Sequence, residues 1–465
     1  MGEKMFDFII NKHKYRHIHF IGIGGISMSG LAEIMLNEGY VVSGSDHKES
    51  IITKKLENNG AKIYNSHSAD NLRGVDLVVY TDAINIENEE LKAAIKLKID
   101  IIDRASFLGA LMKNYDTSIA ISGTHGKTTT TSMVTEIIKN LNSNPTILLG
   151  GQLDDINGNV KIGDKKLFLT EACEYKANVL KYFPTTAVVL NIDEDHLDYF
   201  DNIEHIIKTF KGFVNNLNSN DKLILNLDDE NSKMLLNDKK ENVITFSTKS
   251  PANYNAKNIT YSLDGYPSYD LYYNEKFIGN VELSIMGNHN VSNSLAAIAA
   301  SVENGVSFKD AINGIKIYKG VHRRLEYKGK YNDAIIEDDY AHHPTEIKAS
   351  LNALKNSCKG SLYCIFQPHT FTRTKLLLDS FSKSFNNADV VIITDIYAAR
   401  EKDYGDIHSK TLCDAINSNG GNAFYLKNFS DVCEYLKKNL KENDMAVTMG
   451  AGDVYKIGEA LLEDK

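Results

Sequence analysis

The sequence lacks three features that define large classes of proteins: a long apolar run, an excess of positive charge and paired cysteines. No apolar stretch is long enough to span a bilayer. Acids at Glu3 and Asp7 occupy the region where a signal peptide needs a basic start and an apolar core. The 52 basic and 61 acidic residues give a net charge of −9, which offers no electrostatic support for general nucleic-acid binding. The five cysteines include no CxxC pair, which argues against a disulfide framework and a structural zinc site.

The features that are present are typical of a folded, multidomain protein. The 465 residues are 42% hydrophobic and 24% charged, close to the ordinary globular mix, and this length suggests about three domains. Short β-rich runs alternate with amphipathic helical stretches, without internal repeats or long linkers, and this pattern builds parallel sheets. We therefore predict a soluble, cytoplasmic α/β protein, monomeric or weakly dimeric, with no nucleic-acid partner and no membrane insertion.

The alternation falls into three blocks, separated by breaks near Asn114–Asp116 and Tyr318–His322. The first block contains predicted strands His17–Ile21, Tyr40–Ser43, Asp76–Tyr80 and Ile99–Ile102, with a helix over Ser29–Asn37. The second contains strands Ser118–Ser122, Leu167–Thr170, Ala187–Ile192 and Leu223–Leu227. Residues 242–284 are rich in strand patterns without helices, which predicts an antiparallel insertion. The third block contains strands Ser361–Phe366, Val390–Thr394 and Met445–Met449.

A glycine-rich turn follows the first predicted strand and precedes a helix. It contains Gly22, Gly24, Gly25 and Ser27, and the backbone N–H groups of such a turn can approach a pyrophosphate at the positive end of the helix. Asp46 follows the second strand, where an acid can bind a ribose hydroxyl. The pattern fits a nicotinamide dehydrogenase, another nucleoside diphosphate site or a tight strand–helix turn, because one match of this kind is not specific.

A second loop between a strand and a helix has a stronger signature. It comprises Gly123, Thr124, His125, Gly126, Lys127, Thr128 and Thr129. In a phosphate-binding loop the backbone amides surround the phosphates, the lysine contacts the β- and γ-oxygens, and the following hydroxyl can bind Mg²⁺. Ile121 occupies the position of the first glycine in the general GxxxxGK[ST] pattern, but the strand–helix context favours ATP binding.

Acidic residues and one histidine follow the next strands of the same block. Glu171 ends a buried strand, where a Walker-B carboxylate would bind the metal, and Glu174 lies one helical step later. The strand after it is followed by Asp193, Glu194, Asp195 and His196. Three acids around one imidazole suit a hard divalent cation, although a solvated acidic turn is the simpler interpretation of Asp193 and Glu194. We expect Glu171 and His196 to bind metal at one sheet edge.

Three further polar clusters lie late in the chain. Asn290 and Asn293 precede a predicted apolar helix, Leu295–Val302, and could either read an adenine edge or cap that helix. Arg323 and Arg324 lie at the second break, where an arginine could reach ATP phosphates. The segments Asp338–Pro344 and Gln367–Arg373 both follow apolar strands, and ligand residues in open α/β sheets gather at the carboxyl ends of strands.

The order of these motifs resembles the Mur ligase family over nearly the whole chain. The matching segments are GIGGISMSGLAE, GTHGKTTTT, EACEYKANVL, NIDEDHLDYF, GNHNVSNSLAA, RRLE, DDYAHHPTE, FQPHTFTRT and GAGD. The resemblance implies three α/β domains. A Rossmann-like domain over residues 1–115 would bind a UDP-sugar, and a P-loop-type ATPase domain with the antiparallel insertion would span 116–321. A Rossmann-like domain over 322–465 would bind the amino acid.

The resemblance also implies a role for individual residues. ATP would contact the loop Gly123–Thr129, with Asn290 and Asn293 at the adenine and Arg324 and Asp339 completing the site. The catalytic residues would be Lys127, Glu171, His196 and Arg324, and the Mg²⁺ ligands would be Thr128, Glu171 and His196. The UDP-sugar would bind Gly22, Gly24, Gly25, Ser27 and Asp46, and His343 and Arg373 would serve amino-acid binding or domain closure. Phe210 aligns with a carbamoylated lysine of several sister ligases, which fits the alanine-adding branch.

The resemblance implies ATP-dependent ligation of L-alanine to the carboxylate of UDP-N-acetylmuramate, through an acyl phosphate, in peptidoglycan precursor synthesis. Three alternatives stay open. A recycling ligase would attach a murein tripeptide to the same sugar nucleotide, and a nucleotide-binding regulator would lack turnover. A nicotinamide dehydrogenase would use the first glycine turn but would leave the loop Gly123–Thr129 unexplained.

Overall fold

The structure is a computed structural model that describes residues 6–11, 13–139, 144–239, 241–399 and 401–463. The chain divides into two compact units. The first comprises Met1–Ile192, Ile207–Thr245 and Ala299–Val306, and the second comprises Asp193–Ile206, Phe246–Ile298 and Ser307–Lys465. Within the described ranges, no helix combines the length and apolar character that crossing a membrane requires.

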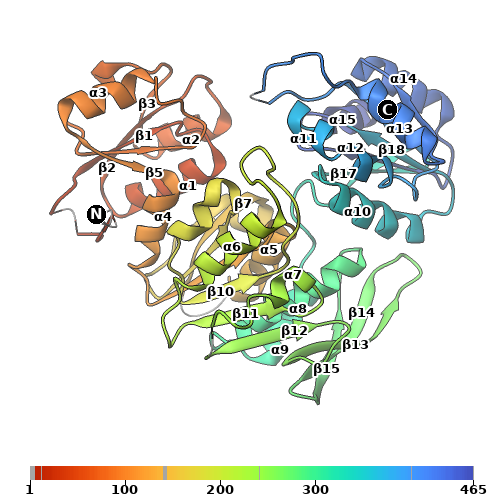
Figure 1. The fold of residues 1–465 in the computed structure, drawn as a ribbon, viewed down its shortest axis with the longest axis horizontal. Coiled ribbons are helices and arrows are strands. Elements are labelled where there is room, and N and C mark those ends of the chain that lie inside the picture. Colours follow the sequence, from red (N-terminus) through yellow and green to blue (C-terminus); the bar gives the residue numbers. More distant parts are fainter. Residues whose placement is uncertain (1–5, 12, 140–143, 240, 400, 464–465) are drawn as a thin grey trace. The chain divides into compact units, whose positions relative to one another are not determined.

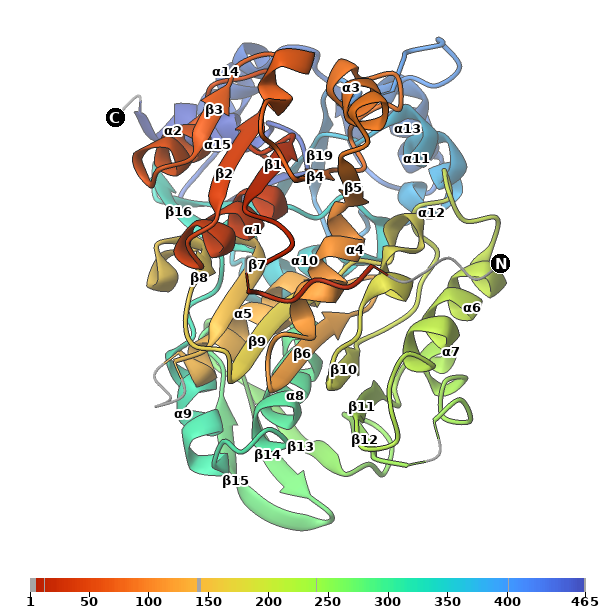
Figure 2. The same ribbon diagram turned by 90° about the vertical axis from the view of Figure 1, so that its left-hand side faces the viewer.

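The first unit begins with a parallel sheet of five strands in the order β3-β2-β1-β4-β5 (Figures 1 and 2). Its strands are β1 (His17–Ile21), β2 (Val41–Ser45), β3 (Lys62–Tyr64), β4 (Leu77–Tyr80) and β5 (Asp100–Asp103). The helices are α1 (Ile26–Asn37), α2 (Ile51–Asn58), α3 (Glu89–Leu97) and α4 (Arg104–Met112). Apolar strand residues such as Phe20 and Val78 are completely buried, as expected for a sheet covered on both faces. The four predicted strands are therefore confirmed, with ends shifted by up to two residues, and β3 is additional.

The same unit continues with strands in the order β11-β10-β6-β9-β7-β8. Their bounds are β6 (Thr117–Ser122), β7 (Thr146–Leu153), β8 (Gly158–Lys161), β9 (Leu167–Ala172), β10 (Thr186–Val189) and β11 (Lys222–Asn226). All neighbours among them pair in parallel except β7 and β8, which form a hairpin that the sequence analysis did not predict. The helices are α5 (Lys127–Ile138), α6 (Ile203–Val214) and α7 (Glu230–Lys233). The loop Gly123–Thr129 therefore joins a central strand, β6, to α5, as predicted.

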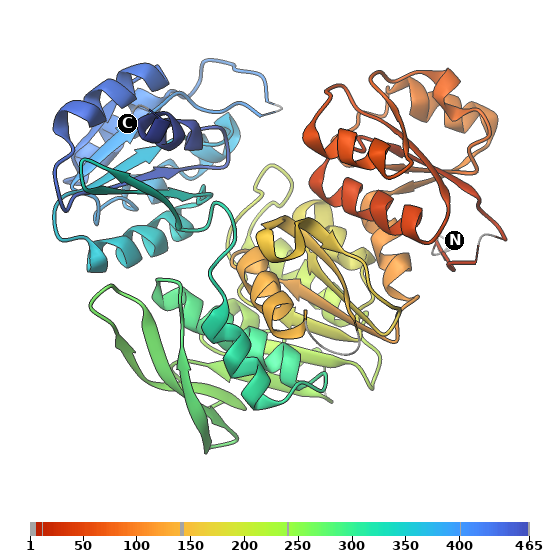
Figure 3. The same cartoon turned by 180° about the vertical axis from the view of Figure 1, so that it is seen from behind.

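The predicted antiparallel insertion is confirmed by the strands β13 (Tyr254–Tyr261), β14 (Pro267–Tyr273) and β15 (Lys276–Glu282). The strand before them, β12 (Val243–Ser247), differs because it pairs with β13 in parallel. Helices α8 (Asn288–Val302) and α9 (Phe308–Ile317) follow, and Figure 3 shows α9 beside these green strands. The helix predicted to start at Leu295 starts seven residues earlier, so Asn290 and Asn293 lie inside it.

The last part of the second unit is a sheet in the order β16-β17-β21-β18-β19-β20 (Figure 1). Its strands are β16 (Glu326–Tyr331), β17 (Ala334–Asp339), β18 (Leu362–Phe366), β19 (Val390–Ile393), β20 (Ala423–Tyr425) and β21 (Met445–Met449). The helices are α10 (Pro344–Ser357), α11 (Phe371–Leu376), α12 (Leu378–Ser382), α13 (Ser409–Ser418), α14 (Phe429–Asn439) and α15 (Tyr455–Glu463). Separate apolar clusters form on the two faces of this sheet, one around Leu351 and Phe381 and the other around Leu436 and Ile457. The predicted third-block residues lie where β17 and β18 end: Asp339 is the last residue of β17, His343 is the N-cap of α10, and Arg373 lies in α11.

Candidate active site

The first glycine turn exposes the amino terminus of α1. Gly22 has φ +81°, and its N–H and that of Ile23 donate to the Ser45 carbonyl at 2.8 and 3.1 Å, which folds the turn over the end of β2. Gly25 is the N-cap of α1, and as a glycine it has no side chain to accept a hydrogen bond from the first turn of this helix. The free N–H groups and the helix dipole make this terminus suitable for an anion.

Asp46 lies against the same turn. Its carboxylate accepts a hydrogen bond from the Gly24 N–H at 3.0 Å, and a Cβ atom at Gly24 would lie only 2.8 Å from Oδ2. A side chain at position 24 would therefore displace the Asp46 carboxylate from its present position. The structure brings Gly22, Gly24, Gly25, Ser27 and Asp46 together at one edge of the first sheet.

The phosphate loop is similar to the first glycine turn, because it also leads into a helix with a glycine N-cap, and one further residue, Asn191, binds its backbone. Gly126, with φ +83°, is the N-cap of α5, and no side chain caps this helix either. Asn191 follows β10 and binds the loop at two residues. Its carbonyl accepts from the Thr124 N–H at 3.0 Å, its Oδ1 accepts from the His125 N–H at 2.8 Å, and its Nδ2 donates to the His125 carbonyl at 3.0 Å. Asn191 thus fixes the backbone of the loop at Thr124 and His125.

Lys127 is fixed by a buried ion pair. Its ammonium group lies 3.0 Å from Glu174 Oε2, donates to the Thr124 carbonyl at 2.9 Å and also donates to the Gly123 carbonyl. The Glu174 side chain is only 2% exposed. Burial by itself would lower the pKa of Lys127, but Glu174, together with Cys173 and Glu171, outweighs it, so the pKa is raised and the lysine stays charged. The structure therefore gives Glu174 a definite contact, which the sequence did not.

Thr128 and Glu171 form a pair of oxygen ligands next to this lysine. The Thr128 hydroxyl donates to Glu171 Oε2 at 3.1 Å, and the Gly150 N–H donates to Oε1 of the same carboxylate at 2.8 Å. A hydroxyl and a carboxylate at one point are the donors that Mg²⁺ prefers, so two of the three predicted metal ligands fit a hard cation. The third, His196, belongs to the second unit.

In the second unit, the acidic segment Asp193–His196 contacts the loops that follow β17 and β18. Asp195 accepts from Arg373 Nε and Nη2 at 3.2 and 3.0 Å, and both side chains are largely buried. The His343 ring lies 2.8 Å from the Glu194 carbonyl through Nε2. Burial alone would raise the pKa of Asp195, but the nearby His196 and Arg373 charges hold it well below its usual range. The predicted closure residues His343 and Arg373 are therefore neighbours of the predicted metal histidine.

The two arginines at the second break have different partners. Arg323 Nε donates to Asp338 Oδ2 at 2.9 Å, and its Nη2 donates to the Gly450 carbonyl at 2.7 Å. Arg324 lies 3.8 Å from Glu346, measured from Nη1 to Oε1, and its guanidinium group lies 5.3 Å from the centre of the Tyr340 ring. The arginine for which ATP contact is predicted is thus the less constrained of the two.

Asp339 is buried and accepts hydrogen bonds from the Ala341 N–H at 2.7 Å and the Ser350 hydroxyl at 3.0 Å. Burial raises the pKa of Asp339 to about 6, despite the opposing effect of Arg324. Asn290 and Asn293 contact each other at 3.0 Å inside α8, and Asn290 Nδ2 donates to the Met286 carbonyl at 2.7 Å. The roles of all three toward ATP stay predictions.

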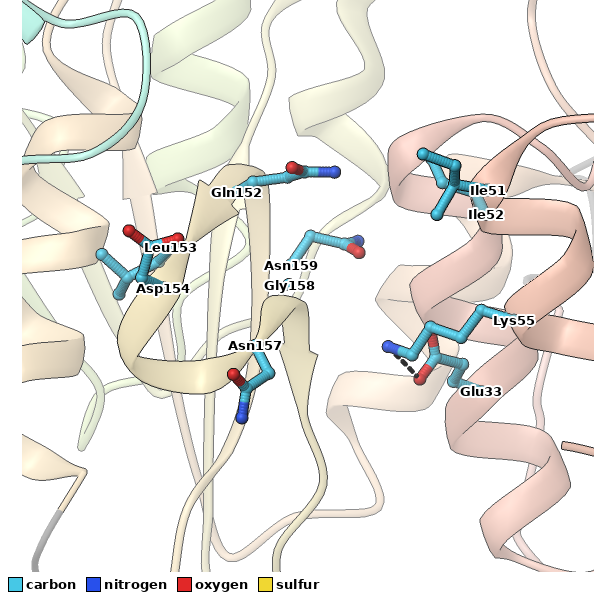
Figure 4. Close-up of a pocket in the computed structure, with 10 residues that line it drawn as sticks. All are labelled: Glu33, Ile51, Ile52, Lys55, Gln152, Leu153, Asp154, Asn157, Gly158 and Asn159. Atoms are coloured by element: carbon cyan, nitrogen blue, oxygen red, sulfur yellow. Dashed lines mark ion pairs between the residues drawn. The ribbon is translucent and has the colours of Figure 1, made fainter. Parts of the chain in front are cut away.

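A cavity of about 260 Å³ lies elsewhere in the first unit, between α1 and α2 on one side and the β7–β8 hairpin on the other (Figure 4). An ion pair between Lys55 and Glu33, 3.1 Å long, lies on its α-helical side. Asn159 on its hairpin side donates to the Ile26 carbonyl at 2.7 Å, and Ile26 is the first residue of α1. No predicted site residue lines this cavity, so it is separate from both glycine loops.

Three family models match consecutive parts of the chain. The catalytic domain of the Mur ligase family matches residues 17–116, the Mur ligase middle domain matches 121–301, and the glutamate ligase domain of Mur ligases matches 323–452. Together with the two glycine loops and the lysine–carboxylate arrangement between β6 and β9, these matches define the class. The chain belongs to the Mur ligase family, and its fold comprises the three α/β domains that the resemblance implied.

Individual relatives are similar over almost the full length. The UDP-N-acetylmuramate–L-alanine ligase of Acetivibrio thermocellus is 50% identical over 458 residues, which are 98% of each chain. The enzyme of the same name from Clostridium novyi is 49% identical and covers 99% of this chain and 100% of its own. The solved UDP-N-acetylmuramate-alanine ligase of Thermotoga maritima has a TM-score of 0.80 at 28% identity, covering 96% of this chain and 98% of its own. A murein peptide ligase from Psychrobacter arcticus has a TM-score of 0.71 at 26% identity, with the same coverage.

We predict that the buried pair of Asp195 and Arg373 stabilises the second unit. Asp195→Ala leaves the Arg373 charge buried without its carboxylate, so the free energy of unfolding should fall by about 3–5 kcal/mol. Asp379→Ala is the matched control, because Asp379 forms an exposed pair with Lys383 and its loss should cost less than about 1 kcal/mol. Urea denaturation followed by circular dichroism measures both. Equal, small effects of the two substitutions would contradict the prediction.

Proposed function

We propose that this protein joins L-alanine to the carboxylate of UDP-N-acetylmuramate, with ATP converted to ADP and phosphate, in the cytoplasmic synthesis of peptidoglycan precursors. The observation that supports this most directly is the phosphate loop, where Lys127, Glu174, Thr128 and Glu171 are arranged before ligand binding. Family membership and the full-length similarity to UDP-N-acetylmuramate–L-alanine ligases support the choice of substrates.

The sugar nucleotide is proposed to bind the first sheet. Its diphosphate would accept hydrogen bonds from the amides around Ser27 at the start of α1, where the N-cap Gly25 has no side chain. One carboxylate oxygen of Asp46 accepts from the Gly24 N–H, and the other accepts from the Lys48 N–H at 3.3 Å. Each oxygen can still accept a second hydrogen bond, from a ribose hydroxyl. Gly22 and Gly25 allow the backbone to approach the ligand closely.

ATP is proposed to bind the loop Gly123–Thr129, with its γ-phosphate toward Lys127. Thr128, Glu171 and His196 would hold Mg²⁺, which when bound neutralises phosphate charge. Asn290 and Asn293 would contact the adenine, and Arg324 and Asp339 would complete the site from the third domain, with proposed boundaries at residues 1–115, 116–321 and 322–465. Closure of that domain, aided by His343 and Arg373, would exclude water and position L-alanine.

The chemistry follows from the poor leaving ability of a carboxylate oxygen. A muramyl carboxylate oxygen attacks the γ-phosphorus and displaces ADP, which gives an acyl phosphate. The free amine of L-alanine then attacks the activated carbonyl carbon, loses a proton and expels phosphate as the amide forms. Lys127 offsets charge on the transferring phosphoryl group, and the loops hold the reactants in line, so the protein contributes positioning and electrostatics.

The proposed function is tested by ADP release from ATP in the presence of UDP-N-acetylmuramate. We expect release to depend on L-alanine, and a murein tripeptide supplied in competition should not replace it. The tripeptide arm matters because a murein peptide ligase also shares this fold. Ligation of the tripeptide in preference to L-alanine would contradict the choice of acceptor, and no release with either amine would contradict the function itself.

Lys127→Ala should lower turnover by at least about 100-fold, because the transition-state charge loses its fixed partner. The exposed Lys166, which lies just before β9, provides the control Lys166→Ala, for which we expect normal turnover. Steady-state ADP release and a thermal melt of each variant measure activity and folding. Near-normal turnover in a folded Lys127→Ala protein would overturn the assignment of the phosphate loop.

Glu171→Gln should raise the Mg²⁺ concentration for half-maximal activity by about tenfold or more, because a charged oxygen ligand becomes neutral. His196→Ala should raise it less, since imidazole is neutral when it binds metal. Glu194→Gln serves as the control, because this neighbouring side chain is exposed. Titration of activity with Mg²⁺ gives the three values. An unchanged requirement in His196→Ala would make His196 a structural residue.

A further inference from the structure

Arg104 is a cation at the edge of the first sheet for which the predicted site has no role. It is the first residue of α4, directly after β5 (Figure 2). Its Nη1 atom lies 3.4 Å from the Ser27 hydroxyl, and Ser27 lies in the first turn of α1, where the sugar nucleotide is proposed to bind. Both residues belong to the first unit. The guanidinium group therefore faces the glycine turn from a different element.

The surroundings of Arg104 supply little negative charge. Within the described part of the chain no carboxylate lies within the 4.0 Å of an ion pair with it, and the groups that act on its charge are Tyr182, Cys173 and Asp82. Asp82 accepts a hydrogen bond from Asn178 at 2.8 Å instead. Because partly buried charges in proteins are ordinarily paired, this arginine is suited to an anion that arrives with a ligand.

The acid next to Arg104 in sequence is also engaged elsewhere. Asp103 lies 2.9 Å from the Lys181 ammonium group and accepts from the Ser106 N–H at 3.0 Å as the N-cap of α4. Its charge is therefore balanced without the arginine. In the same domain Arg73 shows the ordinary situation of a surface arginine, paired with Asp70 at 2.7 Å.

Arg104 is also coupled electrostatically to the segment that contacts the phosphate loop. The Cys173 thiol acts on the charge of Arg104 and on that of Lys127, and Cys173 directly precedes Glu174, the partner of Lys127. The hydrogen-bond contact with Ser27 and this coupling connect Arg104 with both glycine loops.

We infer that Arg104 binds an anionic oxygen of the sugar nucleotide, in its diphosphate or in its carboxylate. Both groups present the paired oxygens that a guanidinium fork recognises. The inference rests on the proposed function, because it takes UDP-N-acetylmuramate as the ligand. Arg104 would hold the substrate across the space between the two glycine loops and leave ATP binding unaffected.

The test is calorimetric titration of the full chain with UDP, UDP-N-acetylglucosamine and UDP-N-acetylmuramate. Arg104→Gln should weaken UDP-N-acetylmuramate binding by about 10–100-fold, the usual effect of losing a charge-assisted hydrogen bond. If the diphosphate is the partner, all three ligands should weaken by a similar factor. If the carboxylate is the partner, only UDP-N-acetylmuramate should weaken, because the other two ligands lack this group.

Two variants control for folding and for net charge. Arg73→Gln removes the same charge from an exposed pair in the same domain and should bind all three ligands normally. Arg104→Lys keeps the positive charge but loses the two parallel N–H donors of the guanidinium group. Its affinity for the sugar nucleotide should therefore lie between those of the native protein and Arg104→Gln, and its Michaelis constant for ATP should stay unchanged.

Native affinity of a folded Arg104→Gln or Arg104→Lys protein for all three ligands would overturn the inference, even if the native enzyme releases ADP as proposed. If the native protein shows no ADP release with UDP-N-acetylmuramate, it is the proposed function that fails.

Discussion

The arrangement of this site depends on one cation that is held in place by the protein itself, the Lys127 ammonium group. It is bound by Glu174 at 3.0 Å and by two carbonyls of its own loop, so its position is set before a nucleotide binds. A long lysine side chain in solvent would lose considerable rotamer entropy on contacting a phosphate. Here that entropy is lost during folding, and three acceptors, the Glu174 carboxylate and two loop carbonyls, replace water around the charge. The uncapped helix α5 then adds its free N–H groups to the same point.

The two glycine loops belong to one unit, which matters for a reaction that transfers a phosphoryl group from one nucleotide to the carboxylate of another. Asn159 on β8 donates to Ile26 at the start of α1, and Lys181 binds Asp103 at the start of α4. Glu171, the proposed metal ligand, is in turn bound by the Gly150 amide of β7. The β7–β8 hairpin therefore contacts both the proposed metal carboxylate and the helix of the sugar-nucleotide loop. The residues proposed for the acceptor amino acid, His343 and Arg373, lie in the other unit.

Much of the fold and both loops were predictable because their signals are local. A buried strand followed by a glycine turn is visible in a short window, and Met445–Met449 was predicted with its final bounds. The contacts of Asn191, Glu174 and Arg104 were not predictable, because each depends on which strands are neighbours in the sheet. Arg373 and Asp195 are 178 positions apart, so no local pattern indicates their pairing. The start of α8 was misplaced because asparagine favours caps and turns, whereas Asn290 and Asn293 here bond inside the helix.

The central claim is that the carboxylate of the sugar nucleotide is activated by phosphoryl transfer at the loop that holds Lys127. The most direct measurement uses UDP-N-acetylmuramate with ¹⁸O in both carboxylate oxygens, together with ATP and L-alanine. When the amine attacks the acyl phosphate, the bridging ¹⁸O atom departs with the phosphate, and the second ¹⁸O atom stays in the amide carbonyl. Mass spectrometry should therefore find one ¹⁸O atom in each released inorganic phosphate and none in ADP. Unlabelled phosphate, or ¹⁸O recovered in AMP, would contradict the account.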